Sequence, residues 1–238
     1  MLRNRRLRKA YHNRTRIPPG DLIFSATGTR DVTWFLESGE RMASAFGSAL
    51  ESIGRPIETF DSVFELGCGC ARVLRQWNDV EGPRFFGSDY NPAGIEWAKE
   101  NIGFASFATN DLEPPLSYAD GSFDLCYSAS VFTHLPENLQ RPWLEELHRV
   151  LKPGGILMLT LSGKGDLVRV TGEEQKQFEN GKLVVVDPKF AGTNICGVYH
   201  PESYVRKEWS SIFKVLRFIP EGALGCPRQD LYVLERLN

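Results

Sequence analysis

The sequence predicts an α/β protein in which helices cover both faces of a mostly parallel sheet. Between residues 62 and 162, short apolar segments of strand length alternate with segments of helical periodicity, a pattern typical of a buried parallel sheet. The chain has 238 residues, of which 42% are hydrophobic and 24% charged, so it can bury a core without disulfides. Because no apolar run approaches about 18 residues, we expect no membrane-spanning helix.

The first element is a basic arm. Residues 1–16 hold seven bases and no acid, whereas the remaining chain has 21 bases against 30 acids. Such an arm can bind nucleic acid or an anionic membrane, and it can equally be a solvated or docked amphipathic helix. It lacks the apolar core of a secretory signal. Pro18-Pro19-Gly20 ends it.

A helix is expected next, over residues 31–54. Its apolar side chains recur at helical spacing, and Gly54 and Pro56 close it. Together with the arm, this helix forms a predicted N-terminal unit, residues 1–56, which caps the main domain of residues 57–238.

The main domain begins as alternating strands and helices. The expected strands are Ser62–Leu66, Arg84–Ser88, Phe104–Ala108, Phe123–Ser128 and Ile156–Leu161. The expected helices lie near 71–78, from Pro92 to about Asn101, and from Glu137 to Leu151. Pro92 suits a first helical position because its φ is already helical.

An insert then separates the fifth strand from the end of the domain. Residues 163–200 contain a polar helix, Gly172–Asn180, and two apolar runs, 183–186 and 195–199. These runs favour an ordered β-hairpin that acts as a substrate lid. A helix near 201–210 and strands at 213–219 and 231–236 follow, and the last two strands are close enough in sequence to pair antiparallel.

A glycine-rich turn, Gly67-Cys68-Gly69-Cys70-Ala71, follows the first strand. Its glycines allow a sharp turn and a close backbone approach to a ligand at the carboxyl end of a parallel strand. The dinucleotide fingerprint GxGxxG fails here because Arg72 follows Ala71, which argues against a nicotinamide oxidoreductase. Glu65, two residues before the first glycine, suits a cationic or amino-bearing ligand.

Two further carboxylates follow the next two strands. Asp89 ends the second strand, 20 residues after Gly69, and a carboxylate there can accept both hydroxyls of a ribose. Asp111 follows the third strand and can accept from the exocyclic amine of adenine. Because parallel strands end at one edge of the sheet, these side chains are expected to surround one site.

The five cysteines do not indicate a metal or a disulfide framework. Their number is odd, and Cys68 and Cys70 have no partner pair at zinc-finger spacing. We therefore expect no metal site, reduced thiols and a cytoplasmic protein.

Five segments in this order carry a family resemblance: ELGCGCA, SDYNP, TNDLE, FDLCYSASVFTHL and LHRVLKPGGILMLTL. They resemble the class I S-adenosylmethionine-dependent methyltransferases, closely over about residues 60–162. The resemblance implies the seven-stranded, Rossmann-like methyltransferase fold with an antiparallel last strand, and S-adenosyl-L-methionine as the cofactor. One departure is Ala71, where the family often has a third glycine.

The resemblance also implies a role for each matching residue. It places the end of the first strand and the glycine-rich turn around the methionine moiety, with Glu65, Gly67, Cys68 and Gly69. For the adenosine, it places Asp89 on the ribose hydroxyls and Tyr90 on the adenine ring. It places Asp111 on the adenine amine, and Leu112 supplies a backbone amide. Beside the sulfonium it places residues after the fourth strand: Ser128, Ala129 and, nearby, Phe132.

The acceptor is less constrained than the cofactor. Enzymes that methylate amino groups of adenine or glutamine resemble one another in an Asn/Asp-Pro-Pro-Tyr/Phe motif, and residues 128–131 are Ser-Ala-Ser-Val instead. The main hypothesis is therefore methyl transfer to O, N or C of a small molecule, a metabolite or saccharide. The alternatives are an RNA or protein methyltransferase that docks through the basic arm, and a cofactor-binding protein without catalysis.

Two histidines are candidate general bases for a hydroxyl acceptor. His134 lies in the segment Phe132–Leu135, and His200 lies between Tyr199 and Pro201. A general base helps to deprotonate such an acceptor. A purely structural role, in which His134 anchors the turn that follows it through a backbone hydrogen bond, is the competing interpretation.

Overall fold

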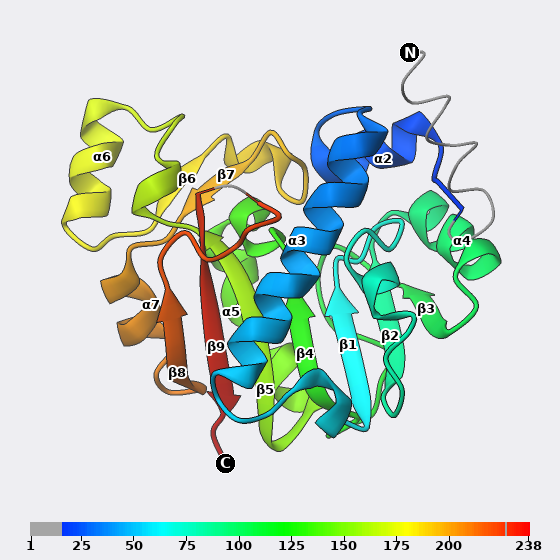
Figure 1. Cartoon of the computed structure of the whole chain (residues 1–238). Coiled ribbons are helices and arrows are strands. Elements are labelled where there is room, and N and C mark those ends of the chain that lie inside the picture. The colour runs from blue at the N-terminus through cyan, green and yellow to red at the C-terminus, as the bar shows by residue number, and fades with distance from the viewer. Residues whose placement is uncertain (1–15, 227) are drawn as a thin grey trace.

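The computed structural model describes residues 16–226 and 228–238. Within them, nine strands form one sheet at the centre of the molecule (Figure 1). The strands are β1 Ser62–Leu66, β2 Arg84–Asp89, β3 Ala105–Thr109, β4 Phe123–Ser128, β5 Leu151–Ser162, β6 Val184–Val186, β7 Gly197–Tyr199, β8 Phe213–Ile219 and β9 Gln229–Arg236.

The sheet is mostly parallel, as the sequence predicts. Strands β3, β2, β1, β4 and β5 lie side by side in that order and run parallel. Strand β9 pairs antiparallel with β5, and β8 pairs antiparallel with β9, which confirms the antiparallel end of the sheet. The strand order reverses between β1 and β4, the place where open α/β sheets bind ligands.

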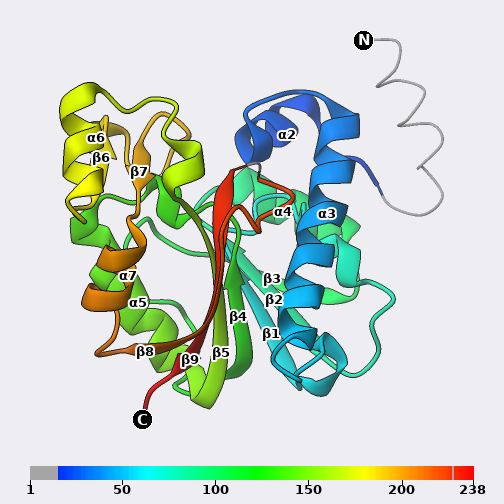
Figure 2. The same ribbon diagram turned by 60° about the vertical axis from the view of Figure 1, so that its left-hand side comes forward.

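Helices cover both faces of the sheet (Figures 1 and 2). One apolar core joins α3 and α4 to the first face, and a second joins α5 and α7 to the other. The helix bounds are α2 Gly20–Thr27, α3 Val32–Glu51, α4 Pro92–Asn101, α5 Glu137–Val150, α6 Gly172–Glu179 and α7 Glu202–Glu208. This doubly wound arrangement places the loops after β1, β2 and β4 together at one edge.

Side-chain caps explain where two of these helices begin. The Asp31 carboxylate accepts hydrogen bonds from the backbone N–H groups of Thr33 and Trp34 at the start of α3. The Asn91 side chain does the same for α4, and Pro92 occupies its first turn. Both caps satisfy backbone donors that have no partner inside the helix.

The predicted helix near residues 71–78 is wrong: only a 3₁₀ segment, Leu74–Trp77, forms there. Ala71 adopts a left-handed conformation with φ +58°, which a continuous α-helix does not tolerate. The Arg75 side chain also donates through Nε to the Ala71 carbonyl oxygen (3.1 Å). The chain therefore turns tightly after β1 instead of entering a regular helix.

The insert extends the sheet beyond β5 with β7 and β6, and it carries helix α6 beside them (Figure 2). Strands β6 and β7 pair antiparallel, as expected for a hairpin, and β7 meets β5 at one pair, Ser162 with Tyr199. Helix α6 begins with a capping box between Thr171 and Glu174. The insert is thus an ordered part of the fold.

Two further expectations concern the basic arm and membrane-spanning helices. The basic arm falls outside the described residues, apart from Arg16, whose backbone oxygen accepts from Arg75. Among the described helices, none combines the length and apolarity that a bilayer crossing requires.

Candidate active site

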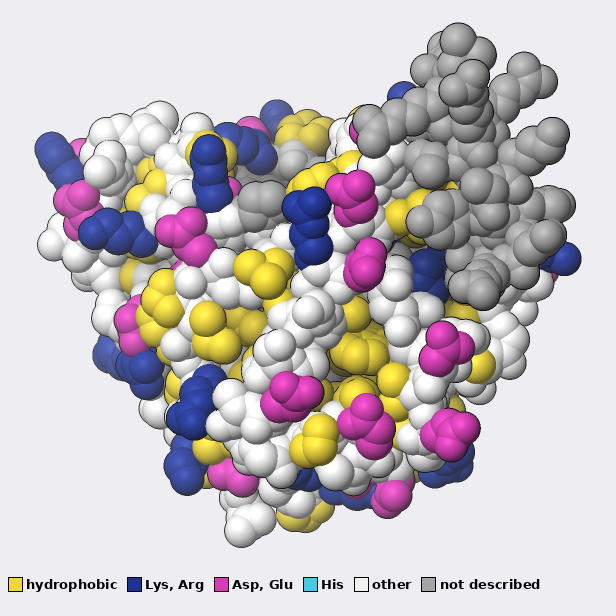
Figure 3. Space-filling model, in the orientation of Figure 1, with side chains coloured by type: hydrophobic (Ala, Val, Ile, Leu, Met, Phe, Trp, Pro, Cys, Tyr) yellow, Lys and Arg dark blue, Asp and Glu magenta, His cyan; other side chains and the backbone are white. Residues whose placement is uncertain are grey.

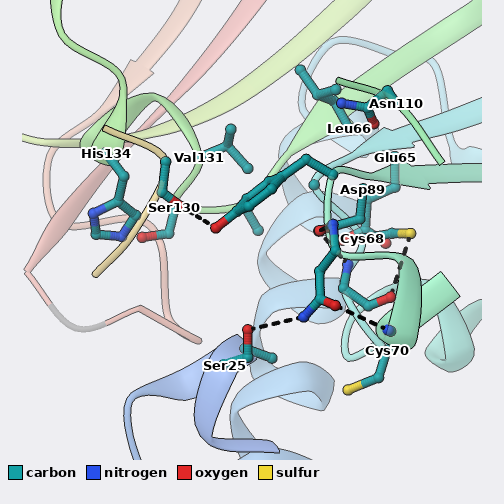
Figure 4. A pocket seen from close by; sticks show the side chains of 18 of the residues that line it. Ser25, Glu65, Leu66, Cys68, Cys70, Asp89, Asn110, Ser130, Val131 and His134 are labelled. Atoms are coloured by element: carbon teal, nitrogen blue, oxygen red, sulfur yellow. Dashed lines mark hydrogen bonds between the residues drawn. The ribbon is translucent and has the colours of Figure 1, made fainter. Parts of the chain in front are cut away.

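A cavity lies at the carboxyl ends of β1, β2 and β4 (Figure 4). Its empty space of about 1040 Å³ includes space that is open to solvent. Its wall comes from the loops after these strands, from α2 and from the segment 190–196 of the insert, called the strap below. Most of the predicted cofactor residues line it: Glu65, Gly67, Cys68, Gly69, Asp89, Tyr90, Asp111, Leu112 and Ala129.

The glycine-rich turn follows β1 along the cavity wall. Gly67 and Gly69 have φ values of +72° and +53°, which favour glycine. A Cβ atom on Gly67 would lie 2.1 Å from Cγ2 of Val131. Glycine is thus required at this position both by backbone conformation and by the close approach of the loop after β4.

Glu65 is buried at the inner end of the cavity. Its Oε2 accepts a hydrogen bond from the Tyr127 hydroxyl (3.1 Å), and Trp77 Nε1 donates to that hydroxyl in turn. Burial raises the pKa of Glu65 to about 8, although Arg72 and the Tyr127 hydrogen bond oppose the rise. The side chain is therefore largely protonated at neutral pH, and a cationic group beside it would favour its ionised form.

Asp89 ties two loops together at the end of β2. Its Oδ2 accepts from Gly69 N and its Oδ1 from Asn91 N, both at 2.8 Å. Burial nevertheless raises its pKa, against the effect of these two bonds. Each carboxylate oxygen can accept a second hydrogen bond, so Asp89 can still receive a pair of ligand hydroxyls.

The third strand end supplies Asp111, Leu112 and Asn110, a residue that the sequence analysis did not single out. Asp111 is exposed at the cavity rim. The Leu112 carbonyl oxygen accepts from Trp143 Nε1 (2.9 Å). Asn110 Oδ1 is buried without a hydrogen-bond partner, which leaves an acceptor for a ligand donor in the cavity wall.

Two residues predicted beside the sulfonium do not line the cavity. Ser128 is buried, and its hydroxyl donates to the Leu66 carbonyl oxygen (3.0 Å). Phe132 is also buried and packs against Trp209, with ring centroids 5.9 Å apart. Both stabilise the loop after β4, whereas its residues Ala129, Ser130 and Val131 reach the cavity.

The two candidate bases lie in different surroundings. His134 lines the cavity, and its Nδ1 lies 2.7 Å from the Cys196 carbonyl oxygen. Burial is the main cause that lowers its pKa, so the ring is neutral at neutral pH. A carbonyl oxygen only accepts, so Nδ1 carries the proton of the neutral ring and Nε2 keeps its lone pair.

His200 lies outside the cavity. Its ring is fully buried, and its Nε2 lies 3.2 Å from Gln140 Oε1. Burial lowers its pKa to about 3. In this position the ring cannot reach a molecule in the cavity, so we assign His200 no role as a general base.

The strap crosses the outer side of the cavity and is held there by hydrogen bonds. The Tyr90 hydroxyl donates to the Gly192 carbonyl oxygen (2.7 Å), and Gly192 N donates to the His134 carbonyl oxygen (2.8 Å). Asn194 Nδ2 donates to the backbone oxygen of Ser25 in α2 (3.3 Å). The strap therefore connects the insert with the loop after β2 and with the N-terminal cap.

Gly192→Ala is expected to displace the strap. Gly192 has φ +79°, and a Cβ there would lie 2.7 Å from Cδ1 of Leu112. The left-handed conformation alone costs an alanine about 1–2 kcal/mol. We expect a lower thermal unfolding midpoint and weaker ligand binding, whereas Gly172→Ala, a glycine of the same insert with open space around it, should change neither. Equal midpoints for the two variants would contradict this role of the strap.

The residues fit S-adenosylmethionine. The ligand carries an ammonium group, a ribose diol and an adenine amine, and the cavity offers Glu65, Asp89 and Asp111 at the ends of three adjacent strands. The unpartnered Asn110 Oδ1 adds an acceptor next to Asp111, the third of these carboxylates. The cavity is also partly enclosed, which suits a ligand that is bound in a cleft.

Comparison with known proteins finds a family match for part of the chain. Residues 64–159 match the sequence profile of the family described as "Methyltransferase domain". A malonyl-[acyl-carrier protein] O-methyltransferase of Erwinia pyrifoliae is 30% identical over 48% of this chain and 42% of its own length. A tRNA(Thr) (cytosine(32)-N(3))-methyltransferase of Saccharomyces cerevisiae is 26% identical over 52% of this chain and 22% of its own length. The chain thus spans less than half of each of these relatives.

Solved structures share the fold. A methyltransferase from Methanosarcina mazei, described as SAM-dependent, superposes with a TM-score of 0.55 and 21% identity over 74% of this chain and 92% of that one. Human N-acetylserotonin methyltransferase in complex with SAM gives a TM-score of 0.55 and 18% identity over 84% of this chain and 52% of that one. Together, these matches support a class I S-adenosylmethionine-dependent methyltransferase, with the methyltransferase domain matched at residues 64–159.

Proposed function

We propose that the chain transfers a methyl group from S-adenosylmethionine to O, N or C of a small molecule, such as a metabolite or saccharide. The observation that carries this proposal is the convergence of Glu65, Asp89 and Asp111 on one partly enclosed cavity. Screening small acceptors for formation of S-adenosylhomocysteine tests it. Turnover of at least one of them is expected, whereas turnover of RNA or protein alone would contradict it.

Each part of the cavity has a proposed role in holding the cofactor. Glu65 and the glycine-rich turn, with Cys68, surround the methionine end, and Asp89 holds the ribose. Tyr90, Asp111 and Leu112 surround the adenine, and Ala129 borders the sulfonium. When bound, the cofactor supplies an electrophilic methyl group with a good leaving group. The protein then contributes alignment and the exclusion of water.

His134 is the proposed general base. Its neutral ring lines the cavity, and the Cys196 carbonyl oxygen fixes the tautomer that leaves Nε2 able to take a proton. The same hydrogen bond also anchors the strap, so the structural and catalytic interpretations of His134 are compatible. A base in this place helps an acceptor to lose its proton as the methyl group arrives.

The acceptor is proposed to enter between the N-terminal cap, within residues 1–56, and the insert, 163–200, which acts as a lid on the domain of residues 57–238. Three contacts support this arrangement: Asn194 with α2, Asn91 with Ser25, and Tyr90 with the strap. Because cap and lid already meet over the cavity, a compact acceptor fits better than a polymer. The contact between cap and lid therefore favours the small-molecule function.

An RNA substrate is the second candidate, because one of the relatives named above is a tRNA methyltransferase. The face drawn in Figure 3 shows Lys and Arg interspersed with Asp and Glu, without a continuous basic patch. Such mixing does not favour binding of a phosphate backbone to that face.

Deleting residues 2–16 separates these two functions. The small-molecule function predicts that the shortened chain turns over a small acceptor at an unchanged rate, because every residue proposed to hold the cofactor or to act as base lies outside residues 2–16. The RNA function predicts loss of RNA binding that weakens with salt in the intact chain. The measurement is S-adenosylhomocysteine formation with both chains, alongside RNA binding at two salt concentrations.

Cofactor binding is expected to release a proton from Glu65. Its pKa is about 8 in the free protein, and a ligand ammonium beside it lowers that pKa by favouring the carboxylate. Affinity should therefore rise as pH increases towards about 8, at most about tenfold per pH unit, and level off above.

Calorimetry in two buffers with different ionisation enthalpies measures this proton directly. We expect release near pH 7 in the native chain and none in Glu65→Gln, which has no proton to lose. Proton uptake, or an affinity that falls as pH rises from 6 to 8, would show that the ammonium lies elsewhere.

A further inference from the structure

Ser130 occupies a strained position in the cavity wall. It follows β4 with φ +65°, in the left-handed region that non-glycine residues rarely adopt. Figure 4 shows it in the loop that also carries Val131, and its hydroxyl forms hydrogen bonds with side chains of two other segments. In the sequence, Ser130 stands out only as part of residues 128–131, which lack the Asn/Asp-Pro-Pro-Tyr/Phe motif.

A closed ring of hydrogen bonds holds this residue. Ser130 N donates to Thr160 Oγ1 (2.8 Å), and that hydroxyl donates to Gln229 Oε1 (2.9 Å). Gln229 Nε2 donates back to Ser130 Oγ (2.8 Å). The ring joins β4, β5 and β9, and the buried amide of Gln229 has a partner at both ends.

The direction of the Ser130 hydroxyl proton follows from its neighbour. Thr133 Oγ1 donates its only proton to the Ser130 carbonyl oxygen (2.7 Å), which can only accept. The contact between the Ser130 and Thr133 hydroxyls (3.0 Å) must then use the Ser130 proton. Ser130 Oγ therefore has no proton left for a ligand and offers the cavity only a lone pair.

Like Ser130, His134 offers the cavity a hydrogen-bond acceptor and no donor. Its Nδ1 proton is committed to the Cys196 carbonyl oxygen, and no hydrogen bond of Nε2 is found among residues 16–226 and 228–238. The cation that acts on this ring is Arg169, whose guanidinium already donates to Asp187 and to the Ile195 carbonyl oxygen. The cavity wall thus offers a ligand two hydrogen-bond acceptors, Ser130 Oγ and His134 Nε2. The Arg169 guanidinium is already paired with protein groups.

We propose that the group methylated by this protein is a primary amine, recognised by Ser130 Oγ and His134 Nε2. The proposal rests on the methyltransferase function above and deepens it. A neutral primary amine has two N–H donors and one lone pair, so it can satisfy both acceptors and still direct its lone pair at the methyl group. A hydroxyl can satisfy one of them, and a carboxylate repels both.

The transfer balances with these groups alone. The amine nitrogen forms a bond to the methyl carbon as the bond between that carbon and sulfur breaks, and the electron pair of the broken bond goes to sulfur. An aliphatic amine is an ammonium at neutral pH, so before the attack it loses one proton to His134 Nε2, from which that proton passes to water, and after the transfer the nitrogen carries the positive charge as a secondary ammonium. The neutral ring is in the right state to accept it.

Binding of matched probes in the presence of S-adenosylhomocysteine tests the proposal. One series is phenethylamine, 2-phenylethanol and phenylacetate, and another is glucosamine, glucose and glucuronate. Within at least one series, the amine should bind about tenfold more tightly than the alcohol, because the alcohol leaves one acceptor unpaired, and the carboxylate should bind most weakly. Absence of amine preference in both series, including absence of any binding, would overturn the proposal.

Two variants show whether Ser130 carries the preference. Ser130→Gly removes the hydroxyl and, because glycine favours this φ, should fold without strain. It should bring the amine-to-alcohol ratio close to one, whereas Ser122→Ala, which loses a hydroxyl bonded to Ala119 at the opposite end of β4, should keep the ratio. An unchanged ratio in Ser130→Gly would overturn the assignment.

The same experiment distinguishes failure of this proposal from failure of the proposed function. Binding of S-adenosylhomocysteine to the native chain is measured first. If it binds but amines are not preferred, the amine proposal is wrong and the methyltransferase function stands; if it does not bind, the function itself is wrong.

Discussion

Asp89→Ala is expected to weaken S-adenosylmethionine binding by about 100-fold or more. In the native chain, this carboxylate is positioned by Gly69 N and Asn91 N and keeps acceptor capacity for two ribose hydroxyls. Each hydrogen bond to a charged group contributes about 1.5–3 kcal/mol, and two of them correspond to a factor of at least about 100. Calorimetry of cofactor binding measures the effect.

The matched control is Asp79→Ala. Asp79 is an exposed aspartate whose carboxylate accepts from Asn78, so its loss should leave the affinity unchanged. Because Asp89 also ties two loops, both variants need thermal unfolding curves that show a folded protein at the titration temperature. Equal affinities of two folded variants would mean that Asp89 does not hold the ribose.

His134→Gln is expected to slow methyl transfer about 100-fold to 10,000-fold, the usual contribution of a general base. A glutamine amide can still donate to the Cys196 carbonyl oxygen and so keep the strap in place, but it cannot take the proton. Cofactor affinity should therefore stay within about threefold of the native value, while the single-turnover rate falls.

The pH profile separates this role from a structural one. A base must be neutral, so activity is lost as pH falls through its pKa, and burial lowers the pKa of His134 below the ordinary value of 6.5. The native rate should thus decline only at more acidic pH than 6.5, and this limb should disappear in His134→Gln. If the rate of the variant declined at the same acidic pH as the native rate, a group other than His134 would be responsible for the decline.

The strands, and most of the residues that line the cavity, were largely predictable, since both depend on local pattern. Strands β1, β4 and β8 have the predicted bounds, because runs of apolar residues between turn signals define them. Asp89 and Asp111 both line the cavity, because carboxylates at consecutive strand ends meet at one edge of the sheet whatever the loops do.

The remaining features depend on tertiary contacts. Nothing in the sequence near Gly192 indicates that the strap reaches Tyr90 and His134. The left-handed conformations of Ala71 and Ser130 are likewise imposed by neighbours distant in sequence, and Ala71 turned a predicted helix into a 3₁₀ segment.

The most direct test of the central claim is a calorimetric titration of the full chain with S-adenosylmethionine, with NADH as the comparison ligand. The cavity and its carboxylates predict saturable binding of one S-adenosylmethionine per chain and no binding of NADH, because Arg72 stands where the dinucleotide fingerprint needs glycine. Binding of NADH without binding of S-adenosylmethionine, or binding of neither, would contradict the account.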